Sequence, residues 1–326
     1  MDAHKARTRF TELRRQRDIN PAELDEIWAA LDTVRIEDIL GSWKGDEFHT
    51  GHRMNGQLAA ARWYGKVFKS INDVEPIVCY DDDGKLFSNN ELSLGGATLW
   101  EVEFRGEVTA TMVYDGQPVF DHFKRVDGST LFGIMNGKRQ RQSGSYPKLI
   151  LAEPSGSVLA SLPEPNDLGG MMDAQKARTR FTELRGQRDI NPAELDEIWA
   201  ALDTVRVEDI LGSWKGDEFH TGHRMNGQLA AARWYGKVFK SINDVEPIVC
   251  YDDDGKLFSN NELSLGGATL WEVEFRGEVT ATMVYDGQPV FDHFKRVDGS
   301  TLFGIMNGKR QRQSGSYLYF LLERDQ

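Results

Sequence analysis

Histidines, carboxylates and glycines gather in one segment of the chain, residues 41–52, which reads GSWKGDEFHTGH. Imidazole titrates near neutral pH and binds borderline metals, so His49 and His52 are candidates for metal ligation or for acid and base catalysis. No HExxH pattern accompanies them. The structural alternative is that the glycines permit a tight passage of the chain while the histidines hydrogen-bond nearby backbone. His52 is the stronger candidate, because it precedes a predicted helix and could point into a cavity.

His122 is the second candidate and lies within VFDHFK at 119–124, which alternates like a strand. With its side chain directed inward, His122 would be suited to ligating haem iron or to moving a proton. Directed outward it would be a cross-strand surface residue, and a hydrogen-bonded core histidine is a further alternative. Asp121, Tyr64 and Lys66 are additional candidates, each with an alternative as an ordinary helix-face or strand-face residue. We expect no metal site, because zinc and EF-hand spacings are absent.

All of these residues occur twice. Residues 1–146 recur as residues 172–317 with three differences, His4/Gln175, Arg15/Gly186 and Ile36/Val207. The second copy therefore places His223 and His293 at the positions of His52 and His122. We predict one domain over residues 1–152, a Pro/Ser/Gly-rich linker over 153–171 and a second domain over 172–326. A natural or a constructed duplication, and pairing of the two repeats within the chain, stay open.

The elements that must position these residues begin with helices. Residues 4–16 predict a polar helix, and residues 20–31 a second one, with Asn20 as N-cap and Pro21 in the first turn. A third helix is predicted from Asn55 onward. Its apolar face would consist of Ala60, Trp63, Tyr64, Val67, Phe68 and Ile71.

A long run of strands follows. From Pro76 to Tyr146 the pattern has period two and is cut by the hairpin dipeptides Asp83-Gly84, Asp115-Gly116, Asp127-Gly128 and Asn136-Gly137. The predicted strands are 43–48, 76–81, 85–89, 97–105, 107–114, 117–126 and 129–135. Residues 317–323 would close the second copy, and residues 148–152 would replace them in the first, which is predicted to be less stable.

About eight antiparallel strands in meander order predict a mainly β (α+β) fold. We expect two lipocalin-like antiparallel up-and-down β-barrels, each with N-terminal helices and one helix after the first strand, because closure removes exposed sheet edges.

Composition excludes several classes of function. The chain has 326 residues and a net charge of -12, from 39 Lys+Arg against 51 Asp+Glu, which disfavours nucleic acid and membrane surfaces as partners. Its two cysteines, Cys79 and Cys250, are too few for a disulfide framework. No secretory h-region and no long apolar run occur. A cytoplasmic location is expected.

One family resemblance rests on specific motifs. GSWKG at 41–45, continuing as DEFHTGH and followed by LAAARWYGKVFKS, resembles the GXWXG family of bacterial and fungal proteins. The block FRGEVTATMVYDGQPVFDHFKRVDGSTLFGIMNGK, ending in YLYFLLER, is similar to the companion domain of unknown function that follows GXWXG in the same short chain. The first copy departs from the pattern because it lacks YLYFLLER. The resemblance implies no established activity.

Gly-x-Trp is also similar to the motif of lipocalins, fatty-acid-binding proteins and nitrobindins, in which the tryptophan plugs one barrel end. That position falls on Trp43 and Trp214 in this sequence.

Three functions remain open. The first is binding of a small lipophilic or aromatic molecule inside the barrel. The second is a haem-dependent or coenzyme-free oxygenase or isomerase of aromatic or terpenoid metabolites, with His52, His122, His223 or His293 as iron ligand or acid/base. The third is a structural duplication with filled barrels. The candidate ligand-binding residues are Trp43, Trp63, Tyr64, Trp100, Phe104 and Asp121, and their copies Trp214, Trp234, Tyr235, Trp271, Phe275 and Asp292.

Overall fold

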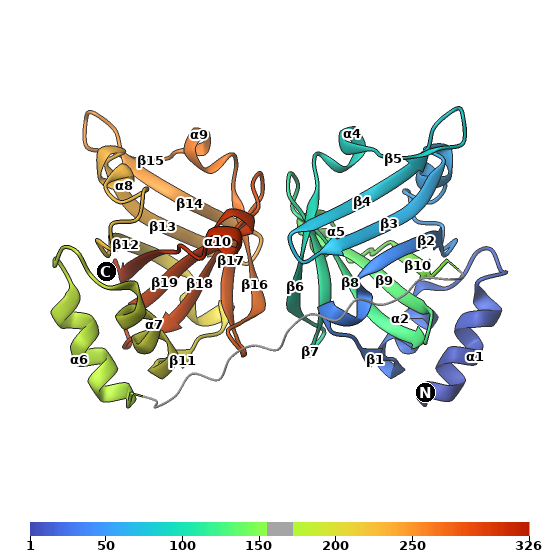
Figure 1. Cartoon of the computed structure of the whole chain (residues 1–326), viewed down its shortest axis with the longest axis horizontal. Coiled ribbons are helices and arrows are strands. Elements are labelled where there is room, and N and C mark those ends of the chain that lie inside the picture. The colour runs from blue at the N-terminus through green and yellow to red at the C-terminus, as the bar shows by residue number, and fades with distance from the viewer. Residues whose placement is uncertain (155–171, 326) are drawn as a thin grey trace. The chain divides into compact units, whose positions relative to one another are not determined.

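The computed structural model describes residues 1–154 and 172–325 (Figure 1). It divides into two compact units, Met1–Leu162 and Pro163–Gln326, and each is described by itself. Most of the predicted linker, residues 155–171, lies outside the described residues. Among the helices of the described ranges, none combines the length and the apolar character needed to cross a membrane.

Each unit begins with the two predicted helices. These are α1 (Ala3–Leu13) and α2 (Pro21–Ala30) in the first unit, and α6 (Ala174–Leu184) and α7 (Pro192–Ala201) in the second. The Asn20 side chain accepts a hydrogen bond from the backbone N–H of Ala22, as its predicted N-cap role requires. Both helices place apolar side chains against the sheet: Trp28, for example, lies edge-on to Phe132 at 5.5 Å.

The strands of the first unit are β1 (Asp32–Thr33), β2 (Gly41–Glu47), β3 (Trp63–Ser70), β4 (Asp73–Tyr80), β5 (Leu86–Ser88), β6 (Ala97–Phe104), β7 (Glu107–Tyr114), β8 (Val119–Asp127), β9 (Thr130–Gly137) and β10 (Lys148–Ala152). Those of the second are β11 (Asp203–Thr204), β12 (Gly212–Glu218), β13 (Trp234–Ser241), β14 (Asp244–Tyr251), β15 (Leu257–Ser259), β16 (Ala268–Phe275), β17 (Glu278–Tyr285), β18 (Val290–Arg296), β19 (Thr301–Gly308) and β20 (Leu318–Arg324).

Short helical turns connect the strands. They are η1 (Ile36–Ile39), α3 (Gln57–Ala60), α4 (Asn90–Ser93) and α5 (Lys138–Ser143), with η2 (Val207–Ile210), α8 (Gln228–Ala231), α9 (Asn261–Ser264) and α10 (Lys309–Ser314) in the second unit.

Strand pairing is antiparallel throughout each unit. In the first unit, β2, β3, β4, β6, β7, β8, β9 and β10 pair in that order, and β10 also pairs with β2. β1 pairs with β8, and β5 with β4. In the second unit, β20 likewise pairs with both β19 and β12. The mainly β, α+β class is therefore confirmed.

The third predicted helix is wrong. α3 ends after one turn, and Arg62 follows it with a positive φ of 54°. Residues 63–70 instead form β3, whose register with β4 is irregular on both sides of Gly65. Such a bulge shifts the alternation of side chains, so that apolar residues fall at a spacing that imitates a helix. Tertiary pairing with β2 and β4 decides the conformation.

The predicted substitute closing strand in the first unit is confirmed. β10 spans residues 148–152 and pairs with β9 on one side and β2 on the other. β20 occupies the same position in the second unit and is two residues longer, seven against five.

The sheet has a buried core on each face. One core, around Trp43, Phe68 and Phe123, lies on its concave side, and the other, around Phe10, Trp28 and Phe132, lies between the sheet and the helices. Neighbouring residues of a strand point to opposite faces, so Asp121 shares a side with Phe123 while His122 points to the helix side.

Candidate functional site

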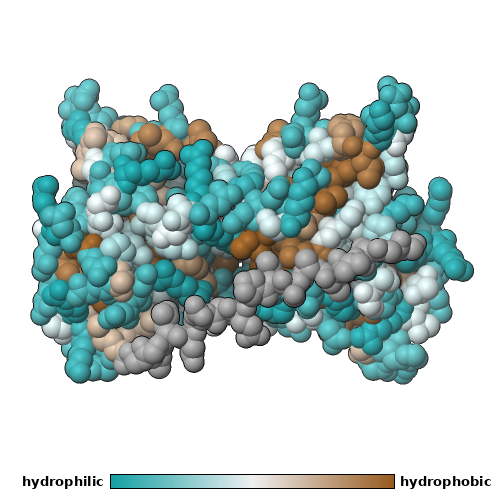
Figure 2. Space-filling view, viewed as in Figure 1, coloured by the Kyte–Doolittle hydropathy of each residue, from teal (hydrophilic) through white to brown (hydrophobic). Residues whose placement is uncertain are grey.

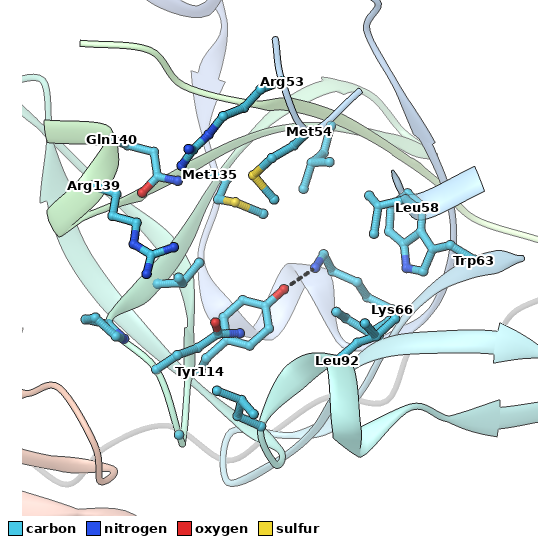
Figure 3. Close-up of a pocket in the computed structure, with 17 residues that line it drawn as sticks. Arg53, Met54, Leu58, Trp63, Lys66, Leu92, Tyr114, Met135, Arg139 and Gln140 are labelled. Carbon is cyan, nitrogen blue, oxygen red and sulfur yellow. Dashed lines mark hydrogen bonds between the residues drawn. The ribbon is translucent and has the colours of Figure 1, made fainter. Parts of the chain in front are cut away.

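Each unit contains a cavity, of about 520 Å³ in the first and about 500 Å³ in the second. Pockets of about 300–1,000 Å³ are usual for small-molecule ligands. The lining of the first cavity is mainly apolar (Figure 3). Its apolar side chains are Met54, Leu58, Trp63, Ile77, Leu92, Leu94, Pro118, Val119, Met135 and Leu149.

Lys66 and Tyr114 form a polar part of the lining of this cavity, and the buried Asp121 forms an ion pair with Lys66. Lys66 Nζ lies 2.7 Å from Asp121 Oδ2, and donates hydrogen bonds to the carbonyl of Pro76 at 3.1 Å and to the Tyr114 hydroxyl at 3.4 Å. Figure 3 shows Lys66 and Tyr114 pointing toward one another. The exposed fractions are 2% for Lys66, 0% for Asp121 and 4% for Tyr114. A charge this deeply buried requires such a partner.

The second unit repeats this group with Lys237, Asp292 and Tyr285. Lys237 Nζ lies 2.8 Å from Asp292 Oδ2, and the Tyr285 hydroxyl donates to the same oxygen at 3.4 Å. Burial raises the pKa of Asp292, and the charge of Lys237 opposes that shift. Burial and the neighbouring carboxylate raise the pKa of Tyr285 well above its ordinary value. The tyrosine therefore keeps its proton and remains a hydrogen-bond donor.

At least one carboxylate oxygen in each group accepts no hydrogen bond from a described residue. Asp121 Oδ1 and Asp292 Oδ1 are buried and accept no hydrogen bond from any described residue. Asp292 also lines the second cavity. A bound molecule with a hydroxyl or N–H could donate to this oxygen, which would remove the free-energy cost of an unsatisfied buried acceptor.

Two glycines bring Trp63 to the cavity. A Cβ at Gly45 would lie 2.2 Å from the Trp63 ring, and a Cβ at Gly65 would lie 1.9 Å from the carbonyl oxygen of Trp43. The Trp63 indole N–H donates to the carbonyl of Gly65 at 2.8 Å. The last glycine of the GSWKG segment therefore leaves the space in which a cavity-wall tryptophan packs.

Of the aromatic residues predicted to bind a ligand, Trp63 lines the first cavity and Trp234 lines the second. Trp43 is buried in the concave core, with its indole N–H donating to Ile39. Tyr64 contacts Ser42 and Tyr80. Trp100 and Phe104 lie on the opposite face of β6 from the core residue Leu99.

The copies of these residues repeat the arrangement, with Trp214 donating to Ile210, Trp271 to Thr269, and Phe275 stacked on His293. Tyr235 differs, because its hydroxyl donates to Asp325 at 2.6 Å.

His122 lies outside the cavity lining and is fully buried on the helix side of β8. Its Nδ1 is 2.8 Å from the Thr111 hydroxyl, its Nε2 is 3.2 Å from Asn136 Nδ2, and its ring stacks on Phe104 at 4.1 Å. His293 has the equivalent contacts. Because both ring nitrogens have partners and neither histidine lines a cavity, these residues do not fit a haem ligand. Burial lowers the pKa of both well below the ordinary value.

His52 lies beside the cavity, in a separate hollow with Arg53, Arg139 and Gln140. Its Nδ1 accepts a hydrogen bond from the backbone N–H of Met54, and its own backbone N–H donates to Asn55. The structural role expected for His52 is therefore present, and His49 contributes its backbone carbonyl, which accepts a hydrogen bond from the N–H of Ile19 at 2.9 Å. His223 has the same contacts in the second unit. The described residues contain no group of three or more side chains placed to hold a metal ion.

Tyr114, Arg53 and Arg139 are cavity residues that sequence reasoning missed. Tyr114 ends β7 directly before the turn at Asp115-Gly116, where it reads as a strand-end aromatic. The arginines lie in a loop and a short helix far apart in the sequence, and only the folded unit brings them to one cavity.

Comparisons with known proteins agree with the motifs. The GXWXG protein family matches residues 26–84 and 197–255, and the domain of unknown function DUF4334 matches residues 95–146 and 266–324. A solved structure, "Crystal structure of protein from Thermomonospora curvata", is 37% identical, with 46% of this chain and 99% of that chain covered and a TM-score of 0.43. No curated protein matches. The chain therefore belongs to the GXWXG family and carries its two domains, GXWXG and DUF4334, twice in tandem.

Proposed function

We propose that each unit binds one small, mainly apolar molecule in its cavity. The observation that carries the proposal is the buried group of Lys66, Asp121 and Tyr114 at one end of an otherwise apolar space. A buried ion pair stabilises a fold little more than apolar residues of similar size would. A few polar groups in an apolar pocket instead fix the orientation of a ligand.

The proposal includes closure of each unit as a lipocalin-like barrel. Support comes from the strand pairing, which starts at β2 and returns to it through β10. Closed barrels of about eight strands are of the size that holds one small ligand. A cytoplasmic location is proposed with it, since Cys79 and Cys250 are buried and free.

The test is titration with the uncharged fluorescent probe N-phenyl-1-naphthylamine. We expect two probe molecules per chain, and a probe emission shifted to the blue by the apolar surroundings. Met135→Trp fills the first cavity and should reduce the number bound to one, and Met306→Trp in addition should abolish binding.

Leu86→Trp with Leu257→Trp serves as the matched control, because these leucines are exposed on β5 and β15 and do not line the cavities. Failure of the folded wild-type chain to bind the probe, or equal loss in the control, would reject the cavity as the binding site. Solvent extraction of the purified protein and mass spectrometry would identify the natural ligand.

A second candidate is cofactor-independent proton transfer, as in an isomerase. It is favoured by Asp292, a cavity carboxylate with an unpartnered oxygen and a pKa raised by burial. An extracted ligand, returned to the protein in D₂O, should then take up deuterium at carbon. Asp121→Asn with Asp292→Asn should stop that exchange, whereas exchange at the rate seen without protein would reject this candidate.

A further inference from the structure

Two arginines stand at the open end of the first cavity. Arg53 belongs to the loop between β2 and α3, and Arg139 to α5. Figure 3 shows them on one side of the cavity with Gln140 between them, and Leu58, Trp63 and Leu92 on the opposite side. Arg53 and Arg139 are exposed, whereas Lys66 and Tyr114 are buried. The arginines therefore mark the end that meets solvent.

Within the described residues, neither guanidinium has a carboxylate partner. The nearby carboxylate of Glu47 is engaged elsewhere, because it accepts hydrogen bonds from the backbone N–H of Gly56 and from the Asn55 amide. Lys66, the remaining cation of the lining, is paired with Asp121. The lining thus carries two uncompensated positive charges in a chain of net charge -12.

The second unit repeats this arrangement. Arg224 and Arg310 line its cavity, and neither forms an ion pair with a described residue. Gln311 accompanies them as Gln140 does in the first unit.

An apolar rim adjoins the open end. Leu92 and Leu94, at the end of α4, line the cavity and are 50% and 58% exposed. Figure 2 shows apolar surface over the α4 part of this unit. The opening therefore offers apolar contact next to positive charge.

From this geometry we infer that the ligand is an amphipathic anion, an aromatic or aliphatic molecule with a carboxylate, sulfonate or similar head group. The head group lies between Arg53 and Arg139 at the open end, where a guanidinium can donate two hydrogen bonds to one anion. The apolar body extends past Trp63 and Met135 toward Tyr114. This inference rests on the proposed cavity binding and adds the charge and direction of the ligand.

The experiment uses two probes that share one skeleton. 1-Anilinonaphthalene-8-sulfonate is N-phenyl-1-naphthylamine with one added sulfonate, so the difference between their affinities isolates the anionic group. We expect the full chain to bind the sulfonate probe about tenfold more tightly, as two partly exposed ion pairs allow. Added salt should weaken the binding of the sulfonate probe and leave the binding of the neutral probe unchanged.

The variant replaces Arg53, Arg139, Arg224 and Arg310 by glutamine. It should bring the affinities of the two probes to about the same value, because the glutamines no longer offer a positive charge to the sulfonate. A control chain in which four exposed arginines outside the cavities, Arg14, Arg15, Arg17 and Arg188, become glutamine has the same net charge. That control should keep the preference.

Each outcome decides one statement. Binding of the neutral probe without preference for the sulfonate, or a preference that survives in the fourfold cavity variant, overturns the anionic ligand and leaves cavity binding standing. A preference lost equally in the control overturns it too, because only net charge would then matter. Absence of binding by either probe rejects cavity binding itself, and the anionic ligand with it.

Discussion

At the residue scale, the ion pair of Lys66 and Asp121 stands out because both of its partners are buried. Both side chains are removed from water, and their mutual attraction compensates for the hydration they lose. Removing one partner leaves the other charged and buried. Removing both leaves an apolar space.

Lys66→Met with Lys237→Met should therefore lower the free energy of unfolding by about 3–5 kcal/mol in each unit. Adding Asp121→Leu and Asp292→Leu should restore most of that loss, because no uncompensated charge remains. Urea unfolding followed by circular dichroism measures both variants. A lysine variant as stable as the wild type would show that the pair is hydrated and not closed off.

The two buried histidines predict a pH dependence of stability. Burial lowers the pKa of His122 and His293, so between that value and about 6.5 the unfolded chain binds a proton that the folded chain does not. The free energy of unfolding is therefore highest above pH 6.5 and decreases as the pH falls. Each histidine lowers it by up to about 1.4 kcal/mol for a decrease of one in pH.

Urea unfolding at pH 7.0 and 5.5 measures this slope. His122→Gln with His293→Gln should reduce it, and a smaller slope should remain because burial also lowers the pKa of His52 and His223. An identical slope in the double variant would mean that other groups cause the acid sensitivity.

Residue type alone identified part of the site. Trp63, Lys66 and Asp121 were candidates because aromatic and charged side chains stand out in apolar segments, and all three lie at or beside the cavity. His122 was also conspicuous, but its direction depends on strand parity relative to the core, which a sequence of period two does not reveal. Arg53 and Arg139 are ordinary in sequence, since exposed arginines are common.

At the element scale, the turn dipeptides made several strands predictable, whereas a bulge prevented the prediction of β3. The dipeptides at Asp115-Gly116 and Asp127-Gly128 do separate β7 from β8 and β8 from β9. Around Gly65 the bulge changes the spacing of inward residues, so β3 was predicted as a helix. Local periodicity identifies an element only where pairing is regular.

The closing strands give a matched pair of substitutions. A Cβ added at Gly304 would lie 2.3 Å from the Phe320 ring, whereas one at Gly133 would lie 3.2 Å from Leu149 Cβ and from the Phe123 ring. Gly304→Ala should destabilise the second unit by about 1–3 kcal/mol through overpacking. Gly133→Ala, whose methyl group would meet longer contacts, should change the stability of the first unit by less than about 1 kcal/mol.

Urea unfolding of each variant measures these effects, with the wild type as reference. The double variant Gly304→Ala, Phe320→Leu should regain stability relative to Gly304→Ala alone, because the ring that meets the new methyl group is gone. Equal losses for Gly133→Ala and Gly304→Ala would refute this account.

At the scale of the whole molecule, two nearly identical sequences form units whose last strands make different contacts. Arg324 on β20 donates to the carbonyls of Leu211 and Asp209, and the following Asp325 accepts from Tyr235. The first unit has Glu153 and Pro154 at these positions. The duplication was evident from sequence, whereas these contacts required knowledge of which strands pair.

We therefore expect the first unit to open more readily than the second. Hydrogen–deuterium exchange of the full chain can show which unit opens more readily. The peptides of β10 and β20 differ in sequence and can be told apart, whereas most other peptides occur in both units. β10 amides should exchange faster than β20 amides. Replacing residues 147–154 by residues 318–325 should slow exchange in the first unit to the rate of the second, and unchanged exchange would refute the role of this strand.

The closing strand also supplies a wall of the cavity, through Leu149 in one unit and Phe320 in the other. Every other lining position in common comes from the repeated residues, so the two cavities differ where the repeat ends. A recombination event just after Tyr146 or Tyr317 would exchange this wall and leave the rest of the pocket intact. The ligand selectivity of two repeats can therefore diverge through a single exchange of this strand, before any other residue of the cavity lining has changed.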